Sequence, residues 1–300
     1  MTTSTMTVAL PSEMGVAAAE GLRDILARSV GTANIATFAE GESPLKWKSI
    51  AEAGWVGIAD GGTDDDALSL RDLVDVASVW GEYCVQLPFV VTLFTRRHSA
   101  AARAFDGPVT VAIPTPQTAV GWSVVPFGLY PGTGLLESMD TDHVIDVPES
   151  SRLDFAPTLL ASEALLLSGL SEQAARELGV LWAAEGAGIA KRMVAIGVEY
   201  VSGRNQFGKP IGSFQAVKHI LANAHIDAEQ AETSVLWAAA EEDKSFELSV
   251  HALELAIAVA ERVIQVHGGM GFTWEMGLHY YLRHLVSLRD LVAGLRIAGR

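Results

Sequence analysis

The sequence has a single cysteine, Cys84, so no disulfide bond can form within the chain. One isolated thiol suits a reducing compartment, and we expect a cytoplasmic protein. No uninterrupted apolar run approaches the length that a bilayer requires, since the run FVVTLF at 89–94 is only core-sized and is followed by Arg96 and Arg97. The N-terminal stretch has neither the basic segment nor the apolar core of an export signal, so we expect none.

Positive charge is also scarce. The chain has 21 Lys and Arg residues against 36 Asp and Glu residues, which gives a formal net charge of −15. Such a surplus of acid argues against nucleic acid and anionic membranes as partners. Any site for an anionic cofactor must therefore depend on local cations and amides. The densest group of acids, DGGTDDD at 60–66, is interpreted as a solvated loop, and no metal site is predicted.

Three zones differ in the spacing of their apolar residues. Residues 11–105 show helical periodicity, residues 107–160 contain short β-type runs separated by Gly, Pro and Asp, and the chain is helical again from about residue 161. Nearly half of all residues are hydrophobic, which suits a large core and subunit interfaces. We predict a mainly α fold with an N-terminal helical domain at 1–106, a shortened middle β domain at 107–160 and a C-terminal helical bundle domain at 161–300.

The bundle domain carries the strongest helical signals, at 175–203, 216–242 and 247–269. The first segment is apolar on more than one face, which is typical of a helix buried in a bundle or in an oligomer interface. We predict that these segments form an antiparallel, up-and-down set of four-helix type. Small residues in the first segment would let neighbouring helices approach closely, namely Ala187, Gly188 and Gly197.

Two turns in this domain carry residues able to bind a ligand. RNQFGKP at 204–210 is typical of a helix end, with Gly203 just past the helix and Pro210 as the stop. An arginine and exposed amides at a turn also suit pyrophosphate oxygens. HGGMG at 267–271, preceded by Gln265, is typical of a second helix end, and its paired glycines would let backbone amides approach a ligand. Taken singly, each turn is better explained as chain reversal.

Taken in order, the motifs RNQFGKPIG, FQ and QVHGGMGF, followed by Arg283, resemble the C-terminal helical domain of the acyl-CoA dehydrogenase family. The resemblance covers residues 180–290 and continues more weakly over PLKWKSIAEAGWVGIA at 44–59. In that family, the corresponding residues of one subunit reach across a dimer interface. They hold the adenosine pyrophosphate of FAD, whose flavin ring sits in the neighbouring subunit.

The resemblance therefore implies roles for residues at both turns. Arg204 would pair with phosphate, Phe207 would pack on the cofactor, and the glycines would admit it. The implied FAD-binding residues are Arg204, Gln206, Phe207, Gln215, Gln265, Gly268 and Gly269.

The middle zone departs from the family. The family places a Gly/Ser-rich segment after a Glu-Pro there, followed by a Trp-containing strand, and both bind the flavin ring. No Glu-Pro-Gly-Ser pattern occurs between residues 85 and 165. Trp122 and the Thr141–Asp142 pair are poor substitutes, and the expected strands are too few to wall a flavin pocket.

The catalytic base is missing at both places that the family uses. Counting forward from Gly268, the family's glutamate falls at Val292, and the alternative position one helix earlier aligns with Leu178. Glu177 is adjacent in sequence, but a helix turns about 100° per residue, so its side chain should point elsewhere. Glu185 is the remaining inward candidate, although a polar group at a helix interface explains it better. Valine cannot accept the α-proton of an acyl thioester.

Three interpretations follow. In the first, which we prefer, the chain is a companion subunit of a heterotetrameric α2β2 acyl-CoA dehydrogenase that acts on bulky CoA thioesters such as steroid intermediates. It resembles short actinobacterial chains of this kind, and a second acyl-CoA dehydrogenase-like subunit would supply the flavin-ring contacts and the glutamate. In the second, the chain is a self-sufficient homomeric enzyme with Glu185 as an unusual base. In the third, it is a structural or regulatory homologue that binds no flavin.

Overall fold

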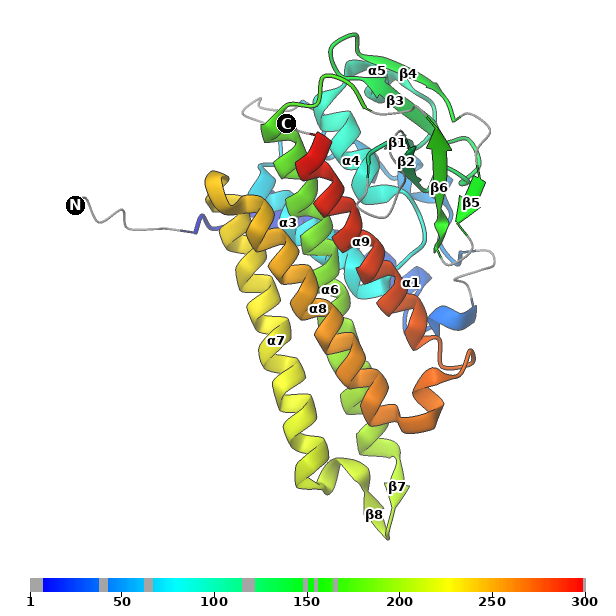
Figure 1. Cartoon of the computed structure of the whole chain (residues 1–300), viewed down its shortest axis with the longest axis vertical. Coiled ribbons are helices and arrows are strands. Elements are labelled where there is room, and N and C mark those ends of the chain that lie inside the picture. The colour runs from blue at the N-terminus through cyan, green and yellow to red at the C-terminus, as the bar shows by residue number, and fades with distance from the viewer. Residues whose placement is uncertain are drawn as a thin grey trace, which may run out of the picture.

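Helices make up most of the described chain, so the predicted mainly α fold is confirmed (Figure 1). The computed structural model describes residues 8–37, 43–61, 67–114, 122–147, 151–153, 156–163 and 167–298. Its α-helices are α1 (Glu13–Ser29), α2 (Trp47–Glu52), α3 (Leu70–Tyr83), α4 (Phe89–His98), α5 (Ala100–Ala104), α6 (Glu172–Gly203), α7 (Gln215–Ala240), α8 (Ser245–His267) and α9 (Leu278–Ala298). Among these helices, none combines the length and apolar character needed to cross a membrane.

The long helices α6 to α9 form the predicted antiparallel bundle (Figure 1). Helix α6 begins at a Ser171 cap, whose hydroxyl accepts a hydrogen bond from the backbone N–H of Ala174 at 3.1 Å. It packs against α3, α7, α8 and α9, which explains why its apolar residues cover more than one face. The bundle therefore has α6 at its centre.

Glycines bring α3 and α6 into backbone contact. A Cβ atom on Gly188 would lie 1.9 Å from the carbonyl oxygen of Ser78, and one on Gly81 would lie 1.9 Å from that of Glu185. A Cβ on Gly197 would approach the Leu221 side chain at 2.9 Å. The small residues predicted to allow close approach thus do so at Gly188 and Gly197, because no larger side chain fits there.

Two three-stranded sheets are formed by the segment that follows the N-terminal helices and precedes α6 in the sequence. One has the order β1–β3–β4 and the other the order β2–β6–β5. Strand β1 runs parallel to β3, with Val109 opposite Gly134, and the remaining pairs are antiparallel. The strand bounds are Val109–Val111 (β1), Trp122–Pro126 (β2), Gly134–Ser138 (β3), His143–Asp146 (β4), Ser151–Leu153 (β5) and Ala156–Glu163 (β6).

Strand β6 corrects the expectation that the chain turns helical at about residue 161. The strand continues to Glu163, and α6 begins only at Glu172. An apolar run such as APTLLASEALLL suits a strand and a buried helix equally well, so its local pattern could not decide between them. The division into three domains stays a prediction.

The N-terminal helices are joined to the sheets and to the acidic loop by polar contacts. The hydroxyl of Thr92 on α4 donates to the carbonyl of Val109 at 3.2 Å and accepts from its N–H at 3.1 Å. Asp60 binds the guanidinium of Arg96 through both carboxylate oxygens, at 2.9 and 2.5 Å. The rest of the acidic loop, residues 62–66, lies outside the described residues.

Candidate functional site

The turn after α6 is a short hairpin. Strand β7 (Asn205–Gln206) pairs with β8 (Lys209–Pro210), and Phe207 and Gly208 form the two-residue turn with φ of 54° and 78°. Positive φ at both central residues is the geometry of a type I′ turn, which matches the twist of the paired strands. The helix itself ends differently from the prediction: Gly203 is its last residue, and the extended Arg204 is the cap, so no left-handed glycine is needed.

Phe207 combines backbone strain with exposure. A non-glycine residue at positive φ costs roughly 1–2 kcal/mol, because its Cβ crowds the following carbonyl. The ring is nonetheless 91% exposed, and its described aromatic neighbour is Phe214, at 6.1 Å between ring centroids. Folding of this chain alone therefore gives little in return for the strain. Strain at an exposed turn points to a role outside the chain's own packing.

The turn after α8 is open toward solvent. Gly268 has φ 61° and ψ −142°, a conformation that only glycine adopts readily. Gly269 has no such restriction, and a Cβ added there would meet no atom within 4 Å. Gln265 lies exposed on the last turn of α8, and Gln215 lies exposed at the start of α7. Nothing in the described chain requires glycine at 269, so the space in front of it is free for an outside group.

All seven predicted cofactor residues lie exposed at one end of the bundle, where α6 and α8 end and α7 begins (Figure 1). The two helix ends are joined by the hydroxyl of Tyr200, which donates to the carbonyl of His267 at 3.3 Å. The structure does not gather all seven around one cavity. Gln206 and Phe207 project with the hairpin, whereas Arg204 borders a cavity beside α6.

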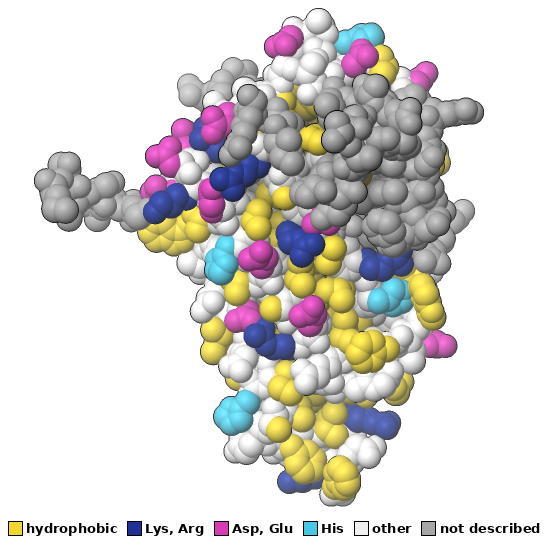
Figure 2. All heavy atoms as spheres, viewed as in Figure 1, with side chains coloured by type: hydrophobic (Ala, Val, Ile, Leu, Met, Phe, Trp, Pro, Cys, Tyr) yellow, Lys and Arg dark blue, Asp and Glu magenta, His cyan; other side chains and the backbone are white. Residues whose placement is uncertain are grey.

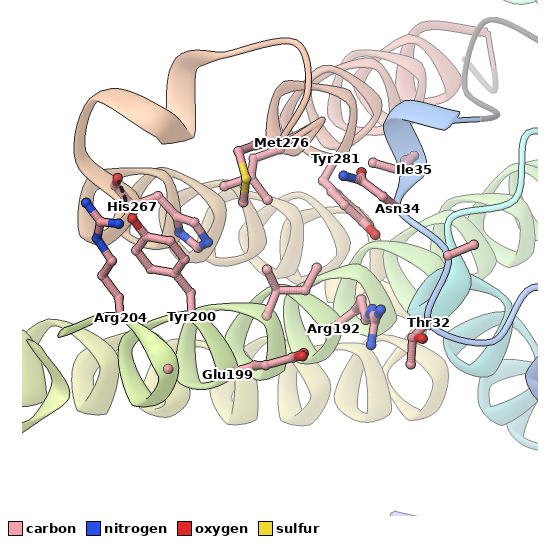
Figure 3. Close-up of a pocket in the computed structure, with 14 residues that line it drawn as sticks. Thr32, Asn34, Ile35, Arg192, Glu199, Tyr200, Arg204, His267, Met276 and Tyr281 are labelled. Atoms are coloured by element: carbon pink, nitrogen blue, oxygen red, sulfur yellow. Dashed lines mark hydrogen bonds between the residues drawn. The ribbon is translucent and has the colours of Figure 1, made fainter. Parts of the chain in front are cut away.

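That cavity has a volume of about 580 Å³ and lies between α6, the end of α8, the start of α9 and the segment after α1 (Figure 3). Sequence reasoning did not find it, because its walls come from parts of the chain that are far apart in sequence. The adjacent Lys191 and Arg192, two charged residues in a mostly apolar stretch of α6, were the available signal. The lining residues are Thr32, Ala33, Asn34, Ile35, Arg192, Ile196, Glu199, Tyr200, Gly203, Arg204, His267, Met276, Leu278 and Tyr281.

The two positions at which the family's base was expected are packed core. Val292 and Leu178 are both fully buried. Val292 lies within the unbroken helix α9, and its Cγ1 would be 3.6 Å from a Cβ on Gly179, the residue after Leu178. The two positions therefore approach each other from α9 and α6 and are filled by aliphatic side chains. Neither residue can accept a proton.

Glu177 points away from this region, as the helical rotation predicts. Its carboxylate pairs with Arg97 at 3.1 Å and with His98 at 3.0 Å, both at the C-terminal end of α4. Burial alone would raise the pKa of Glu177. The hydrogen bond from His98 and the charges of His98 and Arg97 outweigh burial, and the pKa is lowered. Glu177 is a structural anion that ties α6 to α4.

Glu185 is committed to a partner as well. The side chain is 3% exposed, and Nε2 of His284 on α9 hydrogen-bonds its Oε1 at 2.8 Å. Burial, and secondarily the charge of Glu185, raise the pKa of the nearby Cys84 thiol well above its usual value. Glu185 does not line the cavity described above. Its geometry favours the interpretation as a polar contact between α6 and α9.

In the middle zone, Asp142 of the Thr141–Asp142 pair hydrogen-bonds to groups of the chain itself. Its carboxylate accepts a hydrogen bond from the Ser99 hydroxyl and another from the backbone N–H of Ala101, the second at 3.0 Å. Asp142 therefore helps to cap the start of α5. The backbone of Trp122 lies in β2, but its side chain lies outside the described residues, as do residues 115–121 and 148–150. Asp142 thus has a structural role in this chain.

Known proteins resemble this chain in sequence and in fold. Residues 178–289 match the C-terminal domain of acyl-CoA dehydrogenases. The acyl-CoA dehydrogenase FadE34 of Mycobacterium tuberculosis is 36% identical over an alignment of 176 residues, and the match covers 54% of this chain and 25% of FadE34. The acyl-CoA dehydrogenase IpdE2 of the same organism is 38% identical over 130 residues, which are 43% of this chain and 40% of IpdE2. The matched segment thus spans less than half of either relative.

The fold comparison covers nearly the whole chain. One chain in the crystal structure of the ChsE4–ChsE5 complex from Mycobacterium tuberculosis matches with a TM-score of 0.76 at 18% identity. The match covers 98% of this chain and 96% of the matched chain. At that identity the match establishes the fold. Residues 178–289 therefore match the C-terminal domain of the acyl-CoA dehydrogenase family in sequence, and nearly the whole chain shares the fold of the ChsE4–ChsE5 structure.

Proposed function

We propose that this chain is a subunit of an FAD-dependent acyl-CoA dehydrogenase and that it binds the adenosine pyrophosphate of FAD at a subunit interface. A second acyl-CoA dehydrogenase-like subunit supplies the catalytic glutamate. The observation that carries the proposal is a contrast in exposure between the predicted cofactor residues and the two positions expected for the base. The seven cofactor residues are exposed at one end of the bundle, whereas both base positions are fully buried aliphatic side chains.

The residues at the exposed end suit a pyrophosphate and an adenosine. The Arg204 side chain is exposed and forms no ion pair with any described residue, so its guanidinium is available to two phosphate oxygens. The open space in front of Gly269 would let a ligand reach the backbone. Gln215 and Gln265 carry amide groups that can both donate and accept hydrogen bonds. When bound, FAD supplies the hydride acceptor for dehydrogenation of an acyl thioester.

A partner chain is supported by apolar side chains at the same end. Phe207 is 91% exposed, Phe272 77% and Trp274 63%, and they belong to the two turns that carry the cofactor residues. Figure 2 shows hydrophobic side chains gathered at the lower end of the molecule, over the hairpin β7–β8. Exposed apolar groups of this size near polar ones are typical of protein interfaces. The ChsE4–ChsE5 structure is itself a complex of two different chains.

The substrate of the assembled enzyme would be a bulky acyl-CoA, of the steroid type that the resemblance implies. This chain would contribute no proton acceptor to the reaction, because valine and leucine occupy the base positions and Glu185 is held by His284. Its task is to bind and orient the adenosine end of FAD so that the flavin stays fixed in the partner's site. Removal of the α-proton would fall to the partner's glutamate.

Co-purification tests the proposal. The chain is produced alone and together with a candidate partner, an acyl-CoA dehydrogenase-like protein of the same organism that carries the family's glutamate. Flavin absorbance and electron transfer from an acyl-CoA to an artificial acceptor are recorded. We expect colour and turnover only for the complex. Colour and turnover from this chain alone would contradict the division of labour, and a colourless complex would contradict the assignment of FAD.

A pair of substitutions tests the assignment of Arg204. Arg204→Gln removes one charge-assisted contact to phosphate, worth about 1.5–3 kcal/mol, so the complex should hold FAD roughly 10- to 100-fold more weakly. The matched control is Arg296→Gln, which removes an exposed arginine paired with Glu247 at 2.9 Å near the far end of α9. FAD retention should be unchanged in the control. Equal retention in both variants would show that Arg204 does not bind the cofactor.

A further inference from the structure

The cavity beside α6 has the size of a small-molecule site. Its volume of about 580 Å³ lies within the range of roughly 300–1,000 Å³ that such sites occupy. Arg192, Ile196 and Tyr200 follow one another at four-residue spacing, so they lie on one face of α6. The buried Leu278 and Tyr281 form the floor on the α9 side. Figure 3 shows Arg192 and Tyr281 at one end of this space and Tyr200 with His267 at the other.

Arg192 places a positive charge at the inner end of the cavity. Its half-buried guanidinium lies on the same side of the cavity as the Tyr281 hydroxyl (Figure 3), and no carboxylate among the described residues forms an ion pair with it. Burial raises the pKa of Tyr281 to about 12, so the phenol stays neutral at pH 7. A partly desolvated guanidinium beside a neutral phenol attracts an anion strongly.

His267 leaves one hydrogen bond unmade in the cavity wall. The side chain is 3% exposed, and its Nδ1 lies 2.7 Å from the carbonyl oxygen of Val263. A carbonyl only accepts, so Nδ1 carries the hydrogen and Nε2 is an acceptor. That nitrogen is buried and has no hydrogen-bond partner among the described residues. Burial also lowers the pKa of His267, so the ring is neutral at pH 7 and requires a donor from outside.

The spacing of these groups sets the shape of a matching ligand. Arg192 and Tyr200 are eight residues apart, about 12 Å along the helix at 1.5 Å per residue. The His267 ring stacks on the Tyr200 ring, with 4.0 Å between their centroids. Ile196 and Met276 line the space between the two polar ends. A ligand that reaches both ends must be elongated and apolar in its middle.

We propose that this cavity binds an elongated organic carboxylate whose acid group pairs with Arg192 and whose far end donates a hydroxyl or N–H hydrogen bond to Nε2 of His267. A monoanion fits better than a phosphate dianion, because a single cation lies at the inner end. The other charges that face the cavity, Glu199 and Arg204, are exposed at its rim, where water screens them. Since Arg192 is outside the proposed FAD-binding set, this site is additional to the proposed function.

The rigid fluorescent acid 6-hydroxy-2-naphthoate is a suitable probe, because its carboxylate and hydroxyl lie at opposite ends of an apolar body. It is titrated into the full chain and followed by fluorescence. We expect saturable one-to-one binding with a Kd of about 1 mM or lower. The uncharged analogue 6-hydroxy-2-naphthamide should bind about tenfold more weakly, and 2-naphthoate, which lacks the hydroxyl, about threefold more weakly.

Two arginine variants locate the bound acid. Arg192→Gln should weaken binding of the probe at least about tenfold, whereas Arg204→Gln should change it less than about twofold. Equal losses in both variants would place the acid at the outer end and overturn the proposal. Unchanged binding in Arg192→Gln, or no saturable binding to the unaltered chain, would overturn it as well.

A third variant guards against misfolding and against binding at the exposed aromatic turns. Ile196→Trp fills the middle of the cavity and leaves Arg192 in place, so it should abolish binding of the probe while helical circular dichroism stays unchanged. Retained binding would show that the probe sits elsewhere. The complex with Arg192→Gln should keep its FAD, so a failure of this proposal is distinguishable from a failure of the proposed function.

Discussion

The packed interior of the helical bundle and its open end are built on the same helices and differ in almost every physical respect. In the interior, Val292 and Leu178 are fully buried, and α3 and α6 touch backbone to backbone through glycine. At the open end, Arg204 and the three glutamines of the predicted cofactor set are exposed, and Phe207 is held in a strained conformation. Aliphatic side chains fill the interior, whereas polar groups at the open end face solvent.

This difference separates what stabilises the chain from what it offers to other molecules. Buried aliphatic side chains contribute to folding whether or not a partner is present. The positive-φ strain at Phe207 opposes folding of the single chain, whereas the exposed polar groups beside it are solvated and contribute little to its stability. Substitutions in the packed region should accordingly lower the stability of the chain. Phe207→Gly at the open end should raise it and weaken retention of FAD by the complex.

The largest effect is expected from placing the family's carboxylate in the packed region. Val292→Glu introduces an uncompensated charge at a fully buried site, and we expect a loss of about 3–5 kcal/mol in the free energy of unfolding. No dehydrogenase activity should appear in the chain alone. Chemical denaturation followed by circular dichroism measures the loss.

Val292→Gln is the matched control, because it has the same size without the charge. Burial raises the folded-state pKa of the introduced carboxyl above its unfolded value, so the folded chain binds more protons. Stability of Val292→Glu should then fall as pH rises from about 4 to 8, whereas that of Val292→Gln should not. Parallel pH profiles would indicate that position 292 is open to water, and the comparison of the two regions would fail.

A smaller loss is expected at the edge of the packed region. Glu177→Gln leaves Arg97 and His98 without their anion and should cost about 3 kcal/mol at pH 7. Because the folded-state pKa of Glu177 is lowered, its contribution is full above the unfolded pKa and is lost as pH falls through the folded one. The gap in unfolding free energy between the two proteins should therefore shrink below about pH 4.

The control for this prediction lies on the same helix. Glu172→Gln removes an exposed carboxylate that approaches Arg176 only at 3.9 Å, and we expect a change within about 0.5 kcal/mol. A similar loss in both variants, or a gap that stays constant down to pH 3, would show that the Glu177 ion pair does not stabilise the contact between α4 and α6.

The smallest effect has the opposite sign. Phe207→Gly relieves positive-φ strain at the open end, and the gain exceeds the added chain entropy, so the chain should become about 0.5–1 kcal/mol more stable. The same variant should weaken retention of FAD by the complex. Phe272→Gly is the comparison, because Phe272 is also exposed but has no positive φ. The Phe272→Gly variant should be less stable than the unaltered chain. Equal changes in unfolding free energy for the two substitutions would argue against strain at Phe207.

Local sequence patterns predicted the helices, the turns and part of the strands. Helical periodicity identified α6, α7 and α8, because a buried face repeats along each helix. It did not identify β6, whose apolar run suits both strand and helix, nor the hydrogen bond between Glu185 and His284, whose partners are far apart in sequence. The cavity beside α6 escaped notice for the same reason, since residues 32–35 and α9 reach it only through folding.

The sequence by itself indicated the resemblance to acyl-CoA dehydrogenases, the positions of the two turns and the absence of a carboxylate at 292, because each depends on residue identity and short spacing. Only the tertiary structure decided that position 292 is sealed in the core, that Glu177 and Glu185 are bound to partners, and that Arg192 faces a cavity. Burial, ion pairing and cavity shape arise where distant segments meet, and no local pattern contains that information.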